Sequence, residues 1–310
     1  MKLAELRVGN RLEKQEAILW VQKSSQSANG SWFVRGTLED PSGTIGFICF
    51  NAESVARIKE LTDSLPAVVS GQVQADRYGG EGKLQLLADY IDLLPPGRDV
   101  SHLLPAASKD MEEYKKKFLK LVTKISRPPL RELLGEIFSG SRWERFVRNP
   151  AAKRFHHAYI GGLLEHSVDV AETALAVAGT VPGVDLDMVI AGALLHDIGK
   201  TEEISADIGF SYTETGHLVG HITAGALIID AVARQVQFLS EAERKSLLHI
   251  VLSHHGSREK GSPIGCATRE AVIVHYADEL NAVLQQFIET GEKEGAGWNF
   301  NKMMGSMIRV

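Results

Sequence analysis

Histidine and carboxylate side chains gather in the second half of this 310-residue chain. Ten of its eleven histidines lie between residues 156 and 275. Several of them alternate with acidic residues in the order His166, His196, Asp197, His221, His254, Asp278. Imidazole nitrogens combined with carboxylate oxygens form ligand sets that suit manganese, iron, cobalt or nickel. The pattern therefore indicates a metal site to which several separate segments contribute.

The adjacent pair His196 and Asp197 restricts how such a site can be built. Neighbouring side chains on a helix point about 100° apart, so the pair can serve one site only where a helix ends or several helices converge. A carboxylate can bridge two cations that imidazoles from other helices complete. We therefore expect two divalent metal ions as cofactors, with manganese favoured and iron, cobalt or nickel as alternatives.

Helical segments are expected to position these ligands. Apolar residues recur at spacings of three and four throughout residues 155–290, which predicts an almost entirely helical region. The predicted ligands fall near the ends of several of these helices. The stretch 298–310 is apolar enough either to pack on the core or to assemble with another chain, which leaves a homo-oligomer open.

The first 95 residues instead predict short strands separated by turns. Strands are expected at 17–21, 32–38, 44–50, 67–75 and 83–87, with a further edge segment at 90–94 and a short helix at 54–61. About five strands with a helix before the fourth is the order of an OB-type barrel. The pattern Leu38-x-Asp40-x-Ser42-Gly43 also resembles OB-fold nucleic-acid-binding domains.

Aromatic side chains of this barrel are candidates for stacking on nucleic-acid bases. These candidates are Trp32, Phe33, Phe47 and Tyr78. The alternative is that the same rings fill the barrel interior. Residues 1–95 carry 10 Lys and Arg against 12 Asp and Glu, and this near-neutral balance weakens the case for nucleic-acid binding by the barrel alone.

The segment 96–155 is basic, with 14 Lys and Arg against 7 Asp and Glu, whereas residues 156–310 carry 10 against 20. An amphipathic helix is predicted over 110–125, with Lys116 and Lys120 away from its apolar face. These lysines are either a solvated helix face or part of a path for a polyanion. The net charge of −5 conceals this division.

The ligand order resembles the HD superfamily of metal-dependent phosphohydrolases, and His221 and His254 match its binuclear branch. The motif His156-His157-Ala158-Tyr159-x-Gly161-Gly162-Leu163-Leu164-Glu165-His166, together with the OB-type domain, is similar to YhaM-type 3′→5′ exoribonucleases. This similarity extends over essentially the whole chain.

The resemblance implies a role for each matching residue. The first metal would be held by His166, His196, Asp197 and Asp278, and the second by Asp197, His221 and His254. Lys200 would contact the scissile phosphate and join Asp197 in catalysis. His255 would be a ligand, a phosphate contact or an orienting residue, while His156 and His157 would support the ligands or face the substrate.

The predicted fold is thus a small all-β OB-type barrel over residues 1–95, a basic helical connector over 96–155 and an all-α HD-type domain over 156–310. The expected function is metal-dependent 3′→5′ hydrolysis of single-stranded RNA by a water activated between two metals. Three alternatives stay open: a phosphodiesterase or nucleotidase for a small nucleotide with a regulatory barrel, an exonuclease chiefly for single-stranded DNA, and a non-catalytic nucleic-acid-binding protein with a structural metal site.

The composition predicts a cytoplasmic protein without a membrane partner. No apolar run approaches the ~18 residues that span a bilayer, and residues 1–7 lack the apolar region of a signal peptide. The two cysteines, Cys49 and Cys266, are too few and too distant for a disulfide framework.

Overall fold

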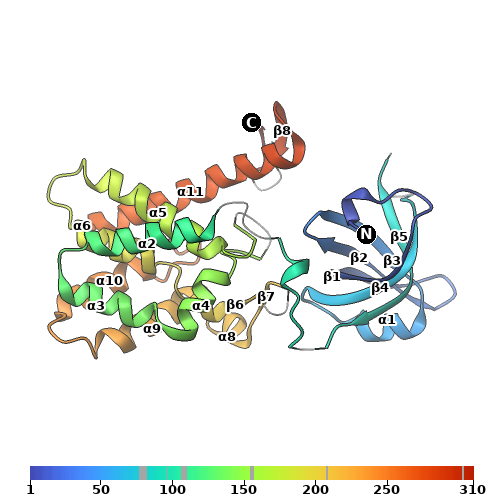
Figure 1. The fold of residues 1–310 in the computed structure, drawn as a ribbon, viewed down its shortest axis with the longest axis horizontal. Helices are drawn as coiled ribbons and strands as arrows, with labels where there is room; N and C mark the ends of the chain where they lie inside the picture. The colour runs from blue at the N-terminus through green and yellow to red at the C-terminus, as the bar shows by residue number, and fades with distance from the viewer. Residues whose placement is uncertain (77–81, 96, 106–109, 154–156, 207–208, 302–303) are drawn as a thin grey trace. The chain divides into compact units, whose positions relative to one another are not determined.

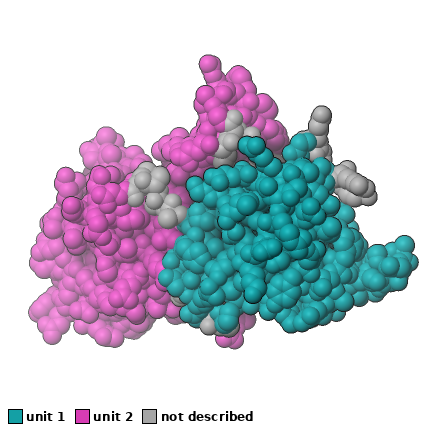
Figure 2. Space-filling model, turned by 45° about the vertical axis from the view of Figure 1, so that its right-hand side comes forward, with its two compact units in different colours: residues 1–106, 205–211 teal, residues 107–204, 212–310 magenta. Residues whose placement is uncertain are grey.

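The computed structural model describes residues 1–76, 82–95, 97–105, 110–153, 157–206, 209–301 and 304–310. The chain forms two compact units (Figure 2), one made of residues 1–106 and 205–211 and the other of residues 107–204 and 212–310. Within the described ranges, no helix is both long enough and apolar enough to cross a membrane.

Five strands close the first unit into a barrel with the order β1-β2-β3-β5-β4 (Figure 1). The elements are η1 (Leu3–Glu5), β1 (Arg11–Gln26), β2 (Trp32–Asp40), β3 (Gly43–Cys49), α1 (Ala52–Ile58), β4 (Leu65–Ala75), β5 (Leu84–Leu93) and η2 (Ser101–Leu103). Strands β3 and β5 pair in parallel and the other neighbours are antiparallel. A helix before the fourth strand of a closed five-stranded barrel confirms the predicted OB-type fold.

Phe47 lies inside this barrel. Its side chain has no exposed surface and belongs to the apolar core of the unit. Gly36 on β2 makes room for it, because a Cβ there would lie 2.7 Å from the Phe47 ring and 1.9 Å from the carbonyl oxygen of Trp20. A completely buried ring cannot stack on a base, so the prediction that Phe47 contacts nucleic acid is wrong.

The last strand of the barrel also differs from the prediction. Segments 83–87 and 90–94 are not separate strands but one strand, β5. Its pairing with β4 shifts register between Ser70, opposite Tyr90, and Gly71, opposite Ala88. Such a bulge accommodates one extra residue without ending the ladder, which explains why the interrupted apolar alternation looked like two segments.

The second unit is mainly helical, as predicted. It contains α2 (Met111–Lys124), α3 (Pro128–Ile137), α4 (Gly140–Arg148), α5 (Gly162–Ala178), α6 (Leu186–Leu195), α7 (Lys200–Glu203), α8 (Glu214–Leu218), α9 (His221–Ala233), α10 (Glu241–Ser253) and α11 (Arg269–Glu294). Short strands β6 (Ile204–Ser205) and β7 (Ser211–Tyr212) pair with each other, and β8 (Trp298–Asn301) pairs with β9 (Ser306–Arg309) at the C-terminal end.

Helices α2, α3 and α4 share one apolar core with the helices that follow them. Phe118 of α2, Leu133 of α3 and Phe146 of α4 are buried in the same cluster as residues of α5, α6, α10 and α11. Helix α2 packs on α5 and α6, and α4 packs on α5 and α7. The predicted basic connector therefore contributes its helices to the second unit, which begins at residue 107.

Candidate metal centre

The predicted ligands of the second unit lie mostly near helix ends. His166 is in the second turn of α5 and His221 is the first residue of α9. His196 and His254 are the C-cap residues of α6 and α10. Asp278 lies in the N-terminal half of α11. These separate segments bring their polar side chains into one buried region.

Gly199 lets two of these segments approach closely. A Cβ at this position would lie 1.9 Å from the carbonyl oxygen of His221, so any other residue would force α7 and α9 apart. The preceding residues His196 and Asp197 lie beyond the last residue of α6. Because they are outside the regular helix, both side chains can face the same site.

The first cluster contains two imidazoles and two carboxylates. His166 Nε2 lies 3.1 Å from His196 Nε2, 3.4 Å from Asp197 Oδ2 and 3.2 Å from Asp278 Oδ1. His196 Nε2 lies 3.4 Å from the same Asp197 oxygen. Both imidazoles and Asp197 are buried. This set of two nitrogens and two oxygens is suited to a divalent transition metal.

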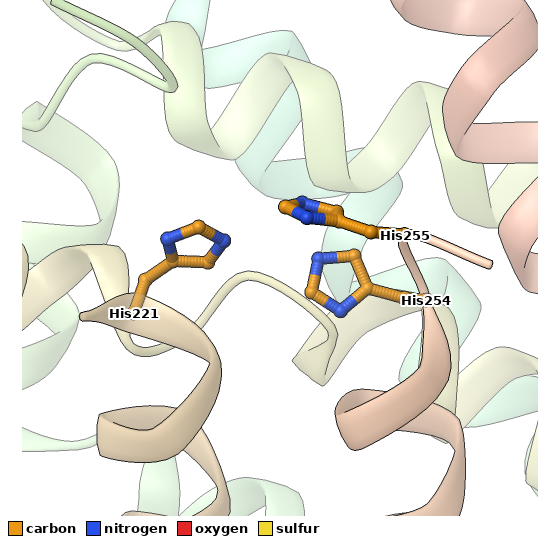
Figure 3. Close-up of side chains that lie close together, drawn as sticks. All are labelled: His221, His254 and His255. Carbon is orange, nitrogen blue, oxygen red and sulfur yellow. The ribbon is translucent and has the colours of Figure 1, made fainter. Parts of the chain in front are cut away.

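The second cluster contains three imidazoles. His221, His254 and His255 are close together in Figure 3, and their nitrogens fall within 4.8 Å of one another. His221 Nε2 and His254 Nε2 lie 3.7 and 3.6 Å from Asp197 Oδ1. Asp197 therefore faces one cluster with each of its two carboxylate oxygens.

All five histidines of the two clusters use Nδ1 for a hydrogen bond within the protein. In each ring Nδ1 lies 2.7–3.0 Å from an oxygen that can only accept, so Nδ1 carries a proton and donates it. The acceptors are Asn281 Oδ1 for His166, the carbonyl of Ala193 for His196, Glu203 Oε1 for His221, the carbonyl of Val251 for His254 and the carbonyl of Lys260 for His255. The Nε2 atoms are thereby directed to serve as metal ligands.

The fit of a metal rests on atoms that the protein leaves unpaired. His221 Nε2, His254 Nε2 and Asp197 Oδ1 are buried, and none has a hydrogen-bond partner among the residues that the structure describes. An unpaired buried polar atom costs about 1–3 kcal/mol. A divalent cation that all three atoms ligate would remove this cost, so the residues present fit the expected metal.

The electrostatics of the site keep its carboxylates ionised. Burial alone would raise the pKa of Asp197, but the Lys200 ammonium and the His196 and His166 imidazoles outweigh it and hold that pKa well below its usual range. Burial likewise opposes ionisation of Asp278, but its hydrogen bond with His166 and the charges of the surrounding imidazoles together outweigh burial and lower its pKa. Ionised carboxylates are the form that ligates a cation.

Three of these histidines have shifted pKa values, and the shifts differ in direction. Burial and then the neighbouring His254 lower the pKa of His255 to about 4, and burial also lowers the pKa of His254. Burial would lower the pKa of His166 too, but hydrogen bonds with Asp197 and Asp278 raise it to about 9. His254 and His255 are therefore neutral and able to bind a cation, whereas a cation bound by His166 competes with a proton.

Lys200 and His157 occupy different places around these clusters. Lys200 Nζ lies 2.6 Å from Asp197 Oδ2, and its side chain is only 12% exposed. His157 is completely buried beside the first cluster, where its Nε2 donates to Asn281 Oδ1 at 3.0 Å. His157 therefore shares a hydrogen-bond acceptor with His166, as expected of a residue that supports a ligand. His156 lies outside the described residues.

Asn281 and Glu203 also belong to the site, although the sequence pattern did not indicate them. Asn281 Oδ1 accepts from His166 at 2.8 Å, and Glu203 accepts from both the backbone N–H and Nδ1 of His221 at 3.0 Å. Asn281 lies one helical turn after Asp278, and Glu203 lies three residues after Lys200. Spacing on a helix was the only signal that could have suggested them.

Trp32 and Phe33 are the two candidate base-stacking residues that the structure shows to be at least partly accessible. Trp32 is 43% exposed, Phe33 is half-buried, and Tyr78 lies outside the described residues. Phe50, which the prediction did not include, is 53% exposed and its ring lies 5.5 Å from that of Phe33. In the second unit, Lys116 and Lys120 are exposed on α2.

Comparison with known families agrees with this geometry. Residues 163–283 match the HD domain. All six predicted ligands and Lys200 lie inside that range. The match to the HD domain supports the prediction that this protein is a metal-dependent phosphohydrolase. Among solved structures, the chain is similar to the second OB-fold domain of replication protein A from Methanococcus maripaludis, with 21% identity over 32% of this chain and 98% of that chain, and a TM-score of 0.23.

Proposed function

We propose that this protein is a metal-dependent 3′→5′ exonuclease that hydrolyses single-stranded RNA and uses two divalent cations. The observation that carries the proposal is the position of Asp197, whose two oxygens face two separate groups of histidine Nε2 atoms. Two cations held in this way supply an activated water and stabilise the attacking and leaving oxygens of an in-line displacement at phosphorus.

The chain's own residues supply the remaining requirements of that reaction. His166, His196, Asp197 and Asp278 would hold one cation, and Asp197, His221, His254 and His255 the other. Lys200 keeps its positive charge, because the attraction of Asp197, Asp278 and Glu203 together with the hydrogen bond to Asp197 outweighs burial and raises its pKa. Its ammonium group can therefore stabilise the negative charge that develops on the phosphoryl oxygens.

The barrel offers a surface suited to a single strand. Half-buried Phe33 near the start of β2 contacts exposed Phe50, which follows β3, and exposed Trp32 precedes Phe33 on the other face of β2. The Lys59 ammonium lies 5.5 Å from the Trp32 ring, and the Arg35 guanidinium lies 5.7 Å from the Phe33 ring. Aromatic rings interleaved with cations are typical of surfaces that bind single-stranded nucleic acid without strict sequence preference.

The test compares RNA strands labelled at the 5′ or the 3′ end, with Mn²⁺, Co²⁺, Fe²⁺ or Ni²⁺ added to the metal-depleted protein. We expect nucleoside 5′-monophosphates to be released stepwise from the 3′ end. Asp197→Ala should abolish hydrolysis and leave RNA binding nearly unchanged, while Glu132→Ala, an exposed carboxylate of α3, should leave both unchanged. Full activity of Asp197→Ala would overturn the proposal.

A second experiment separates an RNA exonuclease from an enzyme for small nucleotides. Trp32→Ala and Phe50→Ala should each weaken RNA binding, by about 1–3 kcal/mol for each base that no longer stacks. Turnover of bis-p-nitrophenyl phosphate should not change, and Tyr90→Ala, which removes an exposed ring of β5, should serve as the control. Turnover of a small nucleotide with no hydrolysis of RNA would favour the alternative, and faster digestion of labelled DNA would change the substrate assignment.

A further inference from the structure

Helix α11 carries a stripe of exposed apolar side chains that winds around the helix by about 40° at each step. Its inner side packs in the core through Ala271, Val274 and Ala277. The uncovered residues recur every four positions and are 39–63% exposed: Val272, Tyr276, Leu280, Leu284 and Ile288. At about 100° per residue, Tyr276 and Leu280 point away from Asp278 and the metal centre. This stripe is therefore separate from the candidate active site.

The β8–β9 hairpin that follows α11 exposes apolar side chains on one of its faces. Its strands pair Phe300 with Met307, and these two residues together with Trp298 are 54–66% exposed on one face. The opposite face carries Ile308, which is 4% exposed, and Asn301, which donates to Thr290 of α11 at 3.1 Å. An antiparallel hairpin on the surface normally buries one apolar face and exposes a polar one. This hairpin buries Ile308 and exposes a second apolar face as well.

Helix α11 and the hairpin together form one feature, which we name the C-terminal arm (residues 269–310). The hairpin packs on α11, and Figure 1 shows the end of α11 and the hairpin extending past the other helices of the second unit. Eight half-exposed apolar side chains of this size present roughly 800 Å², at about 100 Å² each. That is about the area each partner contributes to a standard protein–protein interface, whereas a monomer seldom exposes so large an apolar patch.

The chemistry of the arm favours a protein partner over nucleic acid. Residues 269–310 carry four Lys and Arg against six Asp and Glu, and such a balance repels a polyanion. The stripe is mainly aliphatic, which gives bases little to stack on. Two copies of a helix whose ridge follows every fourth residue can interdigitate those ridges, crossing at about −50°.

We propose that the C-terminal arm is the interface of a homodimer in which the α11 stripes and the apolar hairpin faces of two chains cover each other. Sedimentation velocity of the full chain tests this without reference to activity. The wild-type protein should dimerise with a dissociation constant on the order of 1 µM or below, since interfaces of this area range from micromolar to picomolar.

Leu284→Glu places a charge in the centre of the interface and should weaken dimerisation at least ~100-fold. Trp298→Ser should also weaken it. Leu227→Glu is the matched control, because Leu227 is a 62% exposed leucine on α9, and it should leave the dimer intact. Circular dichroism and bound Mn²⁺ establish that each variant is folded.

A wild-type chain that stays monomeric at concentrations on the order of 100 µM would overturn the proposal. So would a folded Leu284→Glu variant that dimerises as tightly as the wild type. If the wild type is monomeric and Trp298→Ser binds RNA more weakly, the arm is instead a nucleic-acid surface.

Discussion

Asn281 should determine how tightly the first cluster holds its metal. Its side-chain oxygen accepts two hydrogen bonds, from His166 Nδ1 at 2.8 Å and from His157 Nε2 at 3.0 Å. Asn281→Leu keeps the approximate volume of the side chain but removes the acceptor. His166 then loses the contact that keeps Nε2 directed at Asp197 and Asp278.

The size of the effect follows from those two bonds. Loss of a residue that orients a metal-bound histidine lowers metal affinity roughly 10- to 100-fold, which is about 1.4–2.7 kcal/mol. Two buried N–H groups without an acceptor would also destabilise the fold by about 1–3 kcal/mol each. Asn281→Asp keeps an acceptor oxygen, so its affinity should stay at or above the wild-type value.

Isothermal titration of the metal-depleted protein with Mn²⁺ measures this directly. The wild type and Asn281→Asp should each bind two ions, whereas Asn281→Leu should bind one of the two at least ~10-fold more weakly. Thermal denaturation reports the loss of stability separately. Two ions bound by Asn281→Leu with unchanged affinity would refute the role of this hydrogen bond.

Substitutions at four other residues test the rest of the site and the fold. In the same titration, His255→Asn should weaken the binding of one of the two Mn²⁺ ions and leave the affinity for the other unchanged. His255 belongs only to the second cluster. Glu203→Leu should lower the affinity for that same ion roughly 10- to 100-fold. Glu203→Gln retains an acceptor and should bind the ion nearly as tightly as the wild type does. Lys200→Met should lower kcat by about 10²–10³-fold with two ions still bound; unchanged kcat would contradict its role. Asp187 accepts from Ser126 and Arg127, and although burial opposes it, these bonds lower its pKa. Its stabilising effect is therefore present above the unfolded pKa of about 3.9 and disappears as the pH falls through the lowered folded value. Urea unfolding should find Asp187→Asn about 2 kcal/mol less stable at pH 7, with the difference shrinking below about pH 4.

The sequence predicted those secondary-structure elements that depend on residues close together in the chain. The alternation of apolar residues and the Asp40-Pro41-Ser42-Gly43 turn are local properties, and Asp40 Oδ1 indeed accepts from the backbone N–H groups of Ser42 and Gly43 at 2.8 and 3.1 Å. The helix predicted over 110–125 has Asp110 as its N-cap and Ile125 as its C-cap. Such patterns predict elements because neighbouring residues alone produce them.

Features that depend on contacts between distant segments were not predictable in the same way. The burial of Phe47 depends on Gly36 of the neighbouring strand, and the pairing of Asn281 with His166 joins residues 115 positions apart. The role of His255 was left open because its neighbour His254 offers the same ligand type. Only the fold places the nitrogens of both near that of His221.

The most direct test of the two-metal account is to load the full chain with Mn²⁺ and to measure bound manganese and its electron paramagnetic resonance spectrum. The account predicts two ions per chain with the spectrum of a spin-coupled pair, because one Asp197 carboxylate faces both clusters. Asp197→Asn should lose the coupling together with hydrolysis. A single ion, or two uncoupled ions, in a protein that hydrolyses phosphodiesters at full rate would contradict the account.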